Sequence, residues 1–192
     1  MNNSANITLL GQARFASPIR HSVSDEARVS LHIVRTPGVT PPKDLLFELA
    51  GPRKKLFFDS KNTRVGIVTC GGLCPGMNTV IRSAFRELHL VYGVKKVLGF
   101  RDGYQGLDPS HGLMPLVLTA DFVDDIHKEG GTVLGTSRGP VDIGVAVDNL
   151  IKRGVNILLV VGGDGTQRGG HELFREAQKR GHALAVVHSE DR

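Results

Sequence analysis

The stretch that decides the fold of this chain reads Val155-Asn156-Ile157-Leu158-Leu159-Val160-Val161-Gly162-Gly163-Asp164-Gly165-Thr166. Its first seven residues are apolar except for Asn156, which is typical of a strand buried on both faces of a parallel sheet. Glycines follow at once, and apolar residues at helical spacing then predict a helix over residues 166–180, with Gly181 just past its end. The segment indicates a strand, a glycine loop and a helix in direct succession.

The same succession recurs along most of the chain. Apolar β-branched runs predict further strands over residues 64–69, 96–100 and 183–187, and helical spacing predicts helices over residues 78–90, 121–128 (capped by Thr119 or Asp121) and 144–153. This alternation predicts an α/β fold with a doubly wound, mainly parallel sheet. Ligands bind such sheets at the carboxyl ends of the strands, so the loops at those ends are the candidate site.

The first part of the chain has a different pattern. Prolines interrupt short alternating stretches such as Val29-Ser30-Leu31-His32-Ile33-Val34, and the tract Arg53-Lys54-Lys55 is typical of a solvated turn. We therefore expect an N-terminal arm with little regular structure over residues 1–61 and an α/β lobe over residues 62–192.

The composition is that of an ordinary globular protein and argues against several classes of function. Hydrophobic residues make up 40% of the chain, and 24 Lys and Arg against 19 Asp and Glu leave a formal charge of +5, with the basic residues scattered. With only 5% aromatic residues and no Trp, the chain lacks the dense basic face with interleaved aromatics of a nucleic-acid-binding protein, so we expect no nucleic-acid partner. A small anionic ligand suits this charge better.

Cysteine usage and targeting signals bear on where the protein works. Cys70 and Cys74 do not have zinc-knuckle spacing, have no second pair and are too few for a disulfide scaffold. No run approaches the roughly 20 apolar residues needed to cross a bilayer, and the first residues lack the basic cluster of a signal or transit peptide. The sequence therefore predicts a cytoplasmic protein without a membrane partner.

The first of three glycine-bearing loops is Gly71-Gly72-Leu73-Cys74-Pro75-Gly76-Met77-Asn78. Its glycines let backbone N–H groups approach an anion at the positive end of the following helix, which makes it a candidate phosphate-binding turn. It lacks both the Gly-Lys-Ser/Thr of a Walker loop and the glycine spacing of a dinucleotide fingerprint. For this loop on its own, a tight turn without a ligand is the alternative.

Two further loops supply charge. Gly162-Gly163-Asp164-Gly165-Thr166 places a carboxylate between glycines at a helix start, which suits Mg²⁺ beside phosphates; the alternative is that Asp164 caps the helix. Leu134-Gly135-Thr136-Ser137-Arg138-Gly139-Pro140 displays Arg138 between small residues, where a guanidinium can pair its donors with phosphate oxygens. A surface ion pair is the alternative for Arg138.

Together these motifs resemble the phosphofructokinase family, and the amino-acid sequences of the glycine loops resemble those of its plant-type and related bacterial ATP-dependent branch. The similar region runs from about Arg53 to Val187. The resemblance is carried, in chain order, by Thr69-Cys70-Gly71-Gly72-Leu73-Cys74-Pro75-Gly76-Met77-Asn78, Gly103-Tyr104-Gln105-Gly106-Leu107, Gly130-Gly131-Thr132 through Arg138, and Gly162-Gly163-Asp164-Gly165-Thr166-Gln167.

The resemblance implies a Rossmann-like N-terminal lobe of an enzyme that transfers the γ-phosphate of ATP to fructose 6-phosphate in glycolysis, with Mg²⁺ neutralising the phosphates. It also implies a homo-oligomer when the protein is full length. Gly71 would donate its backbone N–H to the nucleotide phosphates, Asp164 would organise Mg²⁺, and Tyr104 would flank the nucleotide. The other nucleotide-binding positions that it implies are Arg138, Gly139, Gly163, Gly165 and Thr166.

Gly165 bears on the phosphoryl donor. In pyrophosphate-using relatives an aspartate occupies this position, and its charge would intrude on the α-phosphate of a nucleotide. Glycine here therefore favours ATP, and a pyrophosphate-dependent enzyme is the alternative, because a second determinant lies outside the sequence in hand.

The chain departs from the family pattern after Ala185-Val186-Val187. The pattern continues with Gly-Ile-Pro and a Lys-Thr-Ile-Asp-Asn-Asp-like stretch that carries the aspartate base, whereas this chain reads His188-Ser189-Glu190-Asp191-Arg192. We therefore assign no catalytic residue, expect the base and the second lobe beyond the C-terminus, and expect no turnover from the chain by itself. A non-catalytic nucleotide-binding or regulatory fragment is the alternative.

Overall fold

A computed structural model describes residues 9–31, 37–38, 46–71 and 74–189 of the chain. Gly72 and Leu73 of the first glycine loop, residues 32–34 of the alternating N-terminal stretch and residues 190–192 lie outside this range. The chain folds as two compact units, Met1–Phe57 and Phe58–Arg192.

The N-terminal unit contains only short strands in its described residues. They form two antiparallel pairs, which are β1 (Phe15–Ala16) with β4 (Lys55–Leu56) and β2 (Arg28–Ser30) with β3 (Leu46–Glu48). Strands this short make few ladder hydrogen bonds, so other contacts must help to hold the unit together.

Arg53 is one such contact. Its side chain is 22% exposed, and the guanidinium donates to the carbonyls of Ser24 (2.8 Å) and Leu49 (2.5 Å). The expectation of a solvated turn is therefore wrong for Arg53, because a guanidinium with five donors can join several backbone segments at once.

The second unit is built on a five-stranded sheet, and the expected mainly parallel α/β fold is confirmed. The strands are β5 (Arg64–Thr69), β6 (Lys96–Phe100), β7 (Leu116–Val117), β8 (Ile157–Val161) and β9 (Ala185–Ser189). Their order is β7-β6-β5-β8-β9, with β6, β5, β8 and β9 parallel and β7 antiparallel to β6 at one edge.

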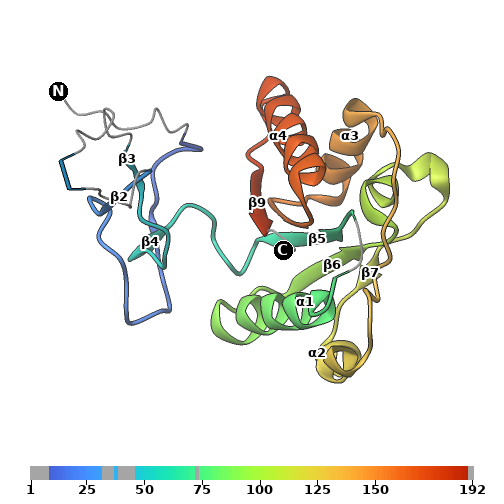
Figure 1. The fold of residues 1–192 in the computed structure, drawn as a ribbon, viewed down its shortest axis with the longest axis horizontal. Coiled ribbons are helices and arrows are strands. Elements are labelled where there is room, and N and C mark those ends of the chain that lie inside the picture. Colours follow the sequence, from blue (N-terminus) through green and yellow to red (C-terminus); the bar gives the residue numbers. More distant parts are fainter. Residues whose placement is uncertain (1–8, 32–36, 39–45, 72–73, 190–192) are drawn as a thin grey trace. The chain divides into compact units, whose positions relative to one another are not determined.

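Helices lie on both faces of this sheet. The α-helices of the described residues are α1 (Met77–Arg86), α2 (Ala120–Asp124), α3 (Ile143–Arg153) and α4 (Asp164–Lys179). A π-helical segment, η1 (Glu87–Val91), continues α1, and the 3₁₀ segments are η2 (Gly103–Leu107), η3 (Pro109–His111) and η4 (Ile126–Lys128). Figure 1 shows α1 and α2 on one face of the sheet and α3 and α4 on the other. None of the helices in the described part of the chain has the length and hydrophobicity to span a bilayer.

The core has two parts, one on each face. Val65 and Ile67 of β5 belong to the apolar cluster on the α1 side, whereas Val68 belongs to the cluster on the α3 and α4 side. This division follows from the alternation of side chains along a strand. Gly66 leaves room for Phe100, whose ring carbon lies 2.8 Å from the position of a Cβ added there. Because both faces are covered, the central strands β5, β6 and β8 are apolar over most of their length.

The strands over residues 64–69 and 96–100 are confirmed, whereas β8 starts two residues later than expected and β9 is shifted by two residues at both ends. Val155 is still part of the turn that ends α3, because its N–H donates to the carbonyl of Leu150 (3.0 Å). Pairing with β9 starts where the Ala185 N–H donates to the carbonyl of Asn156 (2.9 Å). The end of the preceding helix thus sets where β8 begins.

The helix expected over residues 78–90 changes character near its end. The α-helix stops at Arg86, and the N–H of Tyr92 donates to the carbonyl of Glu87 (3.1 Å), five residues earlier. The helix expected over residues 121–128 is also divided, into α2 and η4. Of its two expected caps, Thr119 is confirmed, since its hydroxyl accepts from the backbone N–H of Phe122 (3.2 Å).

Candidate functional site

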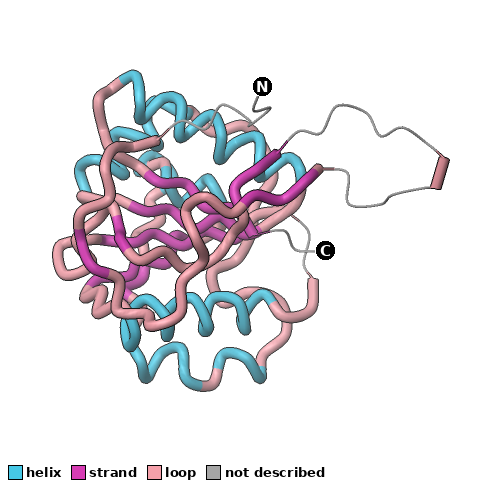
Figure 2. Tube along the Cα trace, turned by 90° about the vertical axis from the view of Figure 1, so that its left-hand side faces the viewer, coloured by secondary structure: helices cyan, strands magenta, loops and turns pink. Residues whose placement is uncertain are grey.

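Two of the three glycine loops leave the sheet at a single edge, whereas the third loop, over residues 134–140, follows η4 and not a strand. Thr69, Val161 and Ser189 end β5, β8 and β9 and are register partners, and Val68 pairs with Phe100 at the end of β6. Figure 2 shows these strands side by side between two layers of helices. Because the four strands are parallel, the segments that follow them start at the carboxyl edge, where open α/β sheets bind ligands.

Two hydroxyl groups hold the loop that carries Arg138 at this edge. The Thr136 hydroxyl donates to the carbonyl of Gly71 (2.8 Å), and the Ser137 hydroxyl donates to the carbonyl of Asp102 (2.6 Å). Residues more than thirty positions apart are thereby joined next to the first glycine loop. The first and third loops therefore meet through these side-chain contacts and not because both follow strands.

Further polar contacts hold the segment that leads into the Arg138 loop, and they were not anticipated from the sequence. The Thr69 hydroxyl, at the end of β5, donates to the carbonyl of Gly135 (2.7 Å). The Asn78 side chain is buried, donates to the carbonyl of Glu129 (3.1 Å) and accepts from the N–H of Val133 (2.8 Å). A threonine at a strand end and an asparagine at a helix start are weak signals by themselves, because both also act as local caps.

The second loop touches the first directly. The Cys70 N–H donates to the carbonyl of Val161 (2.8 Å). Gly162 has a φ of +156°, and a Cβ added there would lie 2.6 Å from the Cys70 carbonyl oxygen and 2.6 Å from Oγ1 of Thr166. Only glycine fits this contact without displacing backbone.

The residues after Gly162 form the first turn of α4. Gly163 is the N-cap residue and Asp164 is exposed at the first helical position, so Asp164 does not occupy the N-cap position. Gly165 is exposed, with no atom within 4 Å of an added Cβ, while Thr166 is 7% exposed. The first N–H groups of a helix have no intrahelical partner, and the helix dipole favours an anion beside them.

Arg138 and Gly139 lie on the exposed part of the third loop. Gly139 has a φ of +126°, a left-handed conformation that favours glycine. Within the described residues the Arg138 guanidinium has no hydrogen bond or ion pair. The surface ion pair considered as an alternative is therefore not formed with any described residue.

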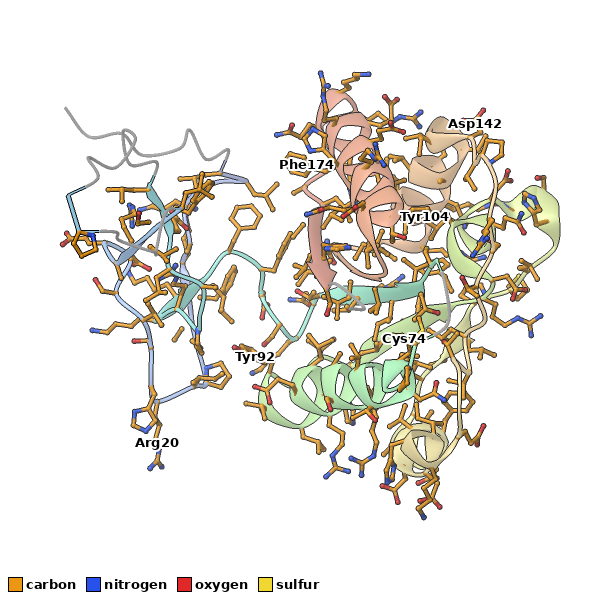
Figure 3. The ribbon with its side chains drawn as sticks, in the orientation of Figure 1. Arg20, Cys74, Tyr92, Tyr104, Asp142 and Phe174 are labelled. Atoms are coloured by element: carbon orange, nitrogen blue, oxygen red, sulfur yellow. The ribbon has the colours of Figure 1, made fainter. Side chains whose placement is uncertain are left out.

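Tyr104 lies half-buried in η2, beside α4 (Figure 3). Its hydroxyl donates to the carbonyl of Thr166 at 2.5 Å. Burial raises the pKa of this phenol well above its ordinary value, and the neighbouring Cys70 and Glu172 act in the same direction. Tyr104 is therefore protonated at neutral pH and remains a hydrogen-bond donor.

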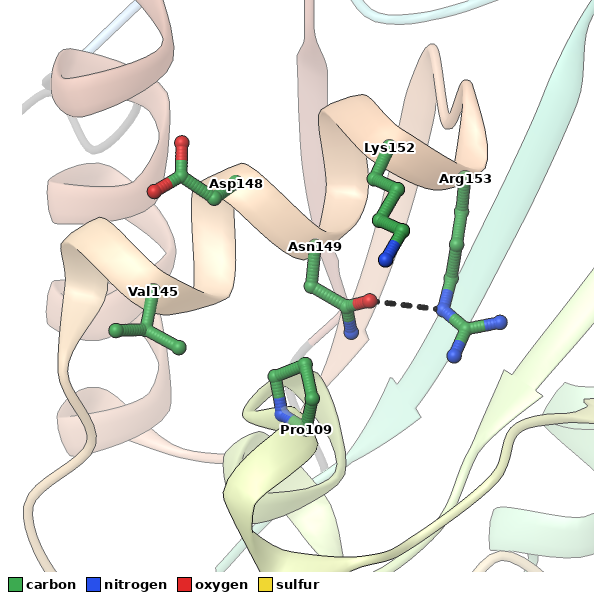
Figure 4. Close-up of a pocket in the computed structure, with 6 residues that line it drawn as sticks. All are labelled: Pro109, Val145, Asp148, Asn149, Lys152 and Arg153. Atoms are coloured by element: carbon green, nitrogen blue, oxygen red, sulfur yellow. Dashed lines mark hydrogen bonds between the residues drawn. The ribbon is translucent and has the colours of Figure 1, made fainter.

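A surface pocket of about 420 Å³ lies elsewhere, between α3 and η3 (Figure 4). Its lining residues are Pro109, Val145, Asp148, Asn149, Lys152 and Arg153, so it includes none of the residues expected in the site. Arg153 ends α3, and its carbonyl accepts from Arg64 at the start of β5 (2.8 Å). This part of the pocket therefore lies at the amino edge of the sheet, away from the glycine loops.

Cys70 gives the site region a measurable pH dependence. Burial raises the pKa of its thiol from 9.0 to about 12. The unfolded chain releases this proton above pH 9 while the folded chain holds it, so we expect the free energy of unfolding to fall between pH 9 and pH 12. One such proton contributes a slope of about 1.4 kcal/mol per pH unit.

Denaturant titrations across this pH range would check the prediction, with Cys70→Ala compared with Cys74→Ala, which removes the less buried thiol. The decline should be shallower in Cys70→Ala than in the unmodified chain and unchanged in Cys74→Ala. Equal slopes in the two variants would contradict the assignment.

The chain matches known proteins over the second unit and beyond. The family model described as phosphofructokinase matches residues 64–189. The ATP-dependent 6-phosphofructokinase of Trypanosoma cruzi (strain CL Brener) is 48% identical over 175 residues, which cover 90% of this chain and 35% of that protein. ATP-dependent 6-phosphofructokinase 7 of Arabidopsis thaliana is 47% identical over 146 residues, with 76% and 30% covered. The chain thus spans about a third of the length of the curated relatives it matches.

Solved structures share the fold. The structure of Pichia pastoris phosphofructokinase in the T-state matches with a TM-score of 0.59 at 27% identity, covering 80% of this chain and 18% of that chain. A pyrophosphate-dependent phosphofructokinase from Marinobacter aquaeolei matches with a TM-score of 0.60 at 13% identity, covering 66% and 32%. With these folds in common, and with relatives at 47–48% identity, the chain belongs to the phosphofructokinase family.

Proposed function

We propose that this chain is the nucleotide-phosphate-binding part of an ATP-dependent 6-phosphofructokinase. The observation that carries the proposal is the hydrogen bond from Thr136 to Gly71, which joins an arginine-bearing loop to a glycine loop at the carboxyl edge of the sheet. The relatives named above, both called ATP-dependent 6-phosphofructokinases, support the same activity.

In this proposal the polyphosphate is held mainly by backbone groups. Gly71 follows β5, and Gly163, Gly165 and Thr166 belong to the start of α4, so their N–H groups would donate to phosphate oxygens at the positive end of the helix. Arg138, with Gly139 beside it, would add a planar guanidinium that can bind phosphate oxygens through paired donors. Charge stabilisation and positioning of this kind are what phosphoryl transfer requires.

Asp164 fits the role of a magnesium ligand. Mg²⁺ takes one or two protein carboxylates together with phosphate oxygens and water, and Asp164 offers an exposed carboxylate in the first turn of α4. The described residues contain no group of three or more His, Cys, Asp or Glu that could hold a metal ion. The ion would therefore enter with the nucleotide phosphates, whose negative charge it would neutralise.

The complete reaction would move the γ-phosphate of ATP to the 1-hydroxyl of fructose 6-phosphate. No stretch of this sequence matches the aspartate-bearing motif that the family pattern provides as the base. For the chain in hand we therefore propose nucleotide binding without turnover, so binding is the property to measure first.

Titration calorimetry with ATP, with and without Mg²⁺, tests the proposal. The chain should bind MgATP more tightly than ATP in EDTA. Asp164→Asn should weaken binding of MgATP by about tenfold, the lower end of what loss of a metal-supporting group costs, and change binding in EDTA little.

Asp121→Asn is the matched control, because Asp121 is also an exposed aspartate in the first turn of a helix, α2. It should leave both affinities unchanged. Absence of MgATP binding by the folded, unmodified chain would contradict the proposed function, and equal losses in the two variants would contradict the role of Asp164.

A further inference from the structure

The Tyr104 side chain reaches the first turn of α4. Its hydroxyl donates to the carbonyl of Thr166, the third residue of that helix, at 2.5 Å. The two residues are 62 positions apart and come from η2 and α4, so the hydrogen bond fixes one element against the other. Thr166 also lies beside Gly162, whose added Cβ would meet Oγ1 of Thr166. The contact is therefore made at the base of the second glycine loop.

Gly169 in α4 makes room for the phenol. A Cβ added at Gly169 would lie 2.6 Å from Cε2 of Tyr104, whereas one added at the neighbouring Gly170 would come nearest to Cγ1 of Val186 (3.3 Å). Glycine inside a helix is destabilising relative to alanine, so Gly169 calls for a packing reason. The close approach of the tyrosine ring provides it.

Tyr104 is itself held in place by the rest of η2. The Asn149 side chain of α3 is buried and donates to the carbonyl of Leu107 at the end of η2 (2.8 Å). At the start of η2, Gly103 has a φ of +61° and packs against Ser137 of the third loop, whose Oγ lies 2.9 Å from an added Cβ. The ring therefore projects from a segment anchored at both ends, as a rigid support requires.

We infer that Tyr104 is a positioning residue, whose hydroxyl fixes the first turn of α4 and with it residues 163–166 at the proposed phosphate site. The inference rests on the proposed function. It differs from a role beside the nucleotide, because the hydroxyl is directed at a backbone carbonyl of the protein. Its consequence is that Tyr104 acts on the phosphates of any bound ligand and not on the nucleoside.

Two ligands separate these roles, namely MgATP and magnesium tripolyphosphate, which has the phosphates but no nucleoside. Tyr104→Phe removes the hydroxyl and keeps the ring. We expect it to weaken binding of both ligands by the same factor, about five- to tenfold, as for loss of one well-placed hydrogen bond. Hydrogen–deuterium exchange of the backbone amides of residues 163–168 should become faster in the same variant.

Tyr92→Phe is the matched control, because Tyr92 is the other of the two tyrosines and follows η1, ahead of the amino end of β6. It should change neither affinity. Gly169→Ala, which displaces the ring and keeps the hydroxyl, is the second test variant in case Tyr104→Phe does not fold. It should weaken binding of both ligands in the same way.

The outcomes separate the inference from the proposed function. Weaker binding of MgATP with unchanged tripolyphosphate binding would overturn the inference in favour of a nucleoside contact. Unchanged affinity for both ligands, even with lower thermal stability, would overturn it in favour of a purely structural role. Failure of the unmodified chain to bind either ligand would instead contradict the proposed function, and the inference would fall with it.

Discussion

Gly165→Asp is expected to weaken binding of MgATP by about a hundredfold while leaving the fold intact. Gly165 is exposed in the first turn of α4, and an added Cβ meets no atom within 4 Å, so the larger side chain fits. Its carboxylate would stand where we propose that the phosphates bind. Two unit charges about 4 Å apart repel by roughly 4 kcal/mol at a surface-like dielectric constant, and screening reduces this to about 2.7 kcal/mol, which corresponds to the stated factor.

The same carboxylate should not destabilise the protein, since an acid near a helix N-terminus stabilises the helix by about 0.3–1 kcal/mol. Calorimetry and thermal unfolding of one sample would therefore give opposite trends for affinity and stability. Gly165→Asn, which has the same shape without the charge, is the control and should lose far less affinity. Equal losses for the two variants would show that size and not charge matters, and full affinity in Gly165→Asp would place the phosphates elsewhere.

Gly162→Ala is expected to lower the free energy of unfolding by about 3 kcal/mol, the upper range for overpacking a filled site. The added Cβ would lie 2.6 Å from the carbonyl oxygen of Cys70, a backbone atom that cannot rotate away, and 2.6 Å from Oγ1 of Thr166. Position 162 also has a φ of +156°, which residues with a side chain rarely adopt. Denaturant unfolding followed by circular dichroism would measure the change.

Gly165→Ala is the control for that substitution, because it lies in the same loop region and adds the same methyl group in open space. It should be neutral or stabilise the helix by up to about 1 kcal/mol, as alanine replaces glycine in a helix. A free energy of unfolding for Gly162→Ala within about 0.5 kcal/mol of the unmodified chain would be inconsistent with direct contact between the two loops.

Much of the fold could be predicted because parallel strands buried on both faces are recognisable in the sequence as short runs of consecutive apolar residues. The runs over residues 64–69 and 96–100 are apolar after an initial Arg64 or Lys96, up to Thr69 in the first run, and their limits coincide with β5 and β6. The ends of the helices were harder to predict than the strands. The apolar spacing of residues 78–90 is compatible with either an α- or a π-helical ladder, and the change after Arg86 is a matter of backbone hydrogen bonding that spacing does not record.

The candidate site could be predicted as a set of loops but not as an arrangement of side chains. Gly71, Asp164 and Arg138 stand out in the sequence because each lies in a short loop that contains several glycines. The hydroxyls of Thr136 and Ser137 do not, because their partners lie 65 and 35 positions away. The sequence around Tyr104 also gives no indication that its hydroxyl donates to the carbonyl of Thr166, which lies 62 positions away.

By itself, the sequence determined the parallel sheet, the edge at which its glycine loops gather and the kinds of group those loops display. These features depend on residue types that are close together along the chain: apolar runs, glycines and the charges between them. Only the tertiary structure decided that Gly162 must be glycine, that Asp164 is the first residue of α4 and not its N-cap, and that Tyr104 turns toward the helix. Such features depend on distances between atoms from separate segments, which exist only once hydrogen bonding and close packing have brought those segments together.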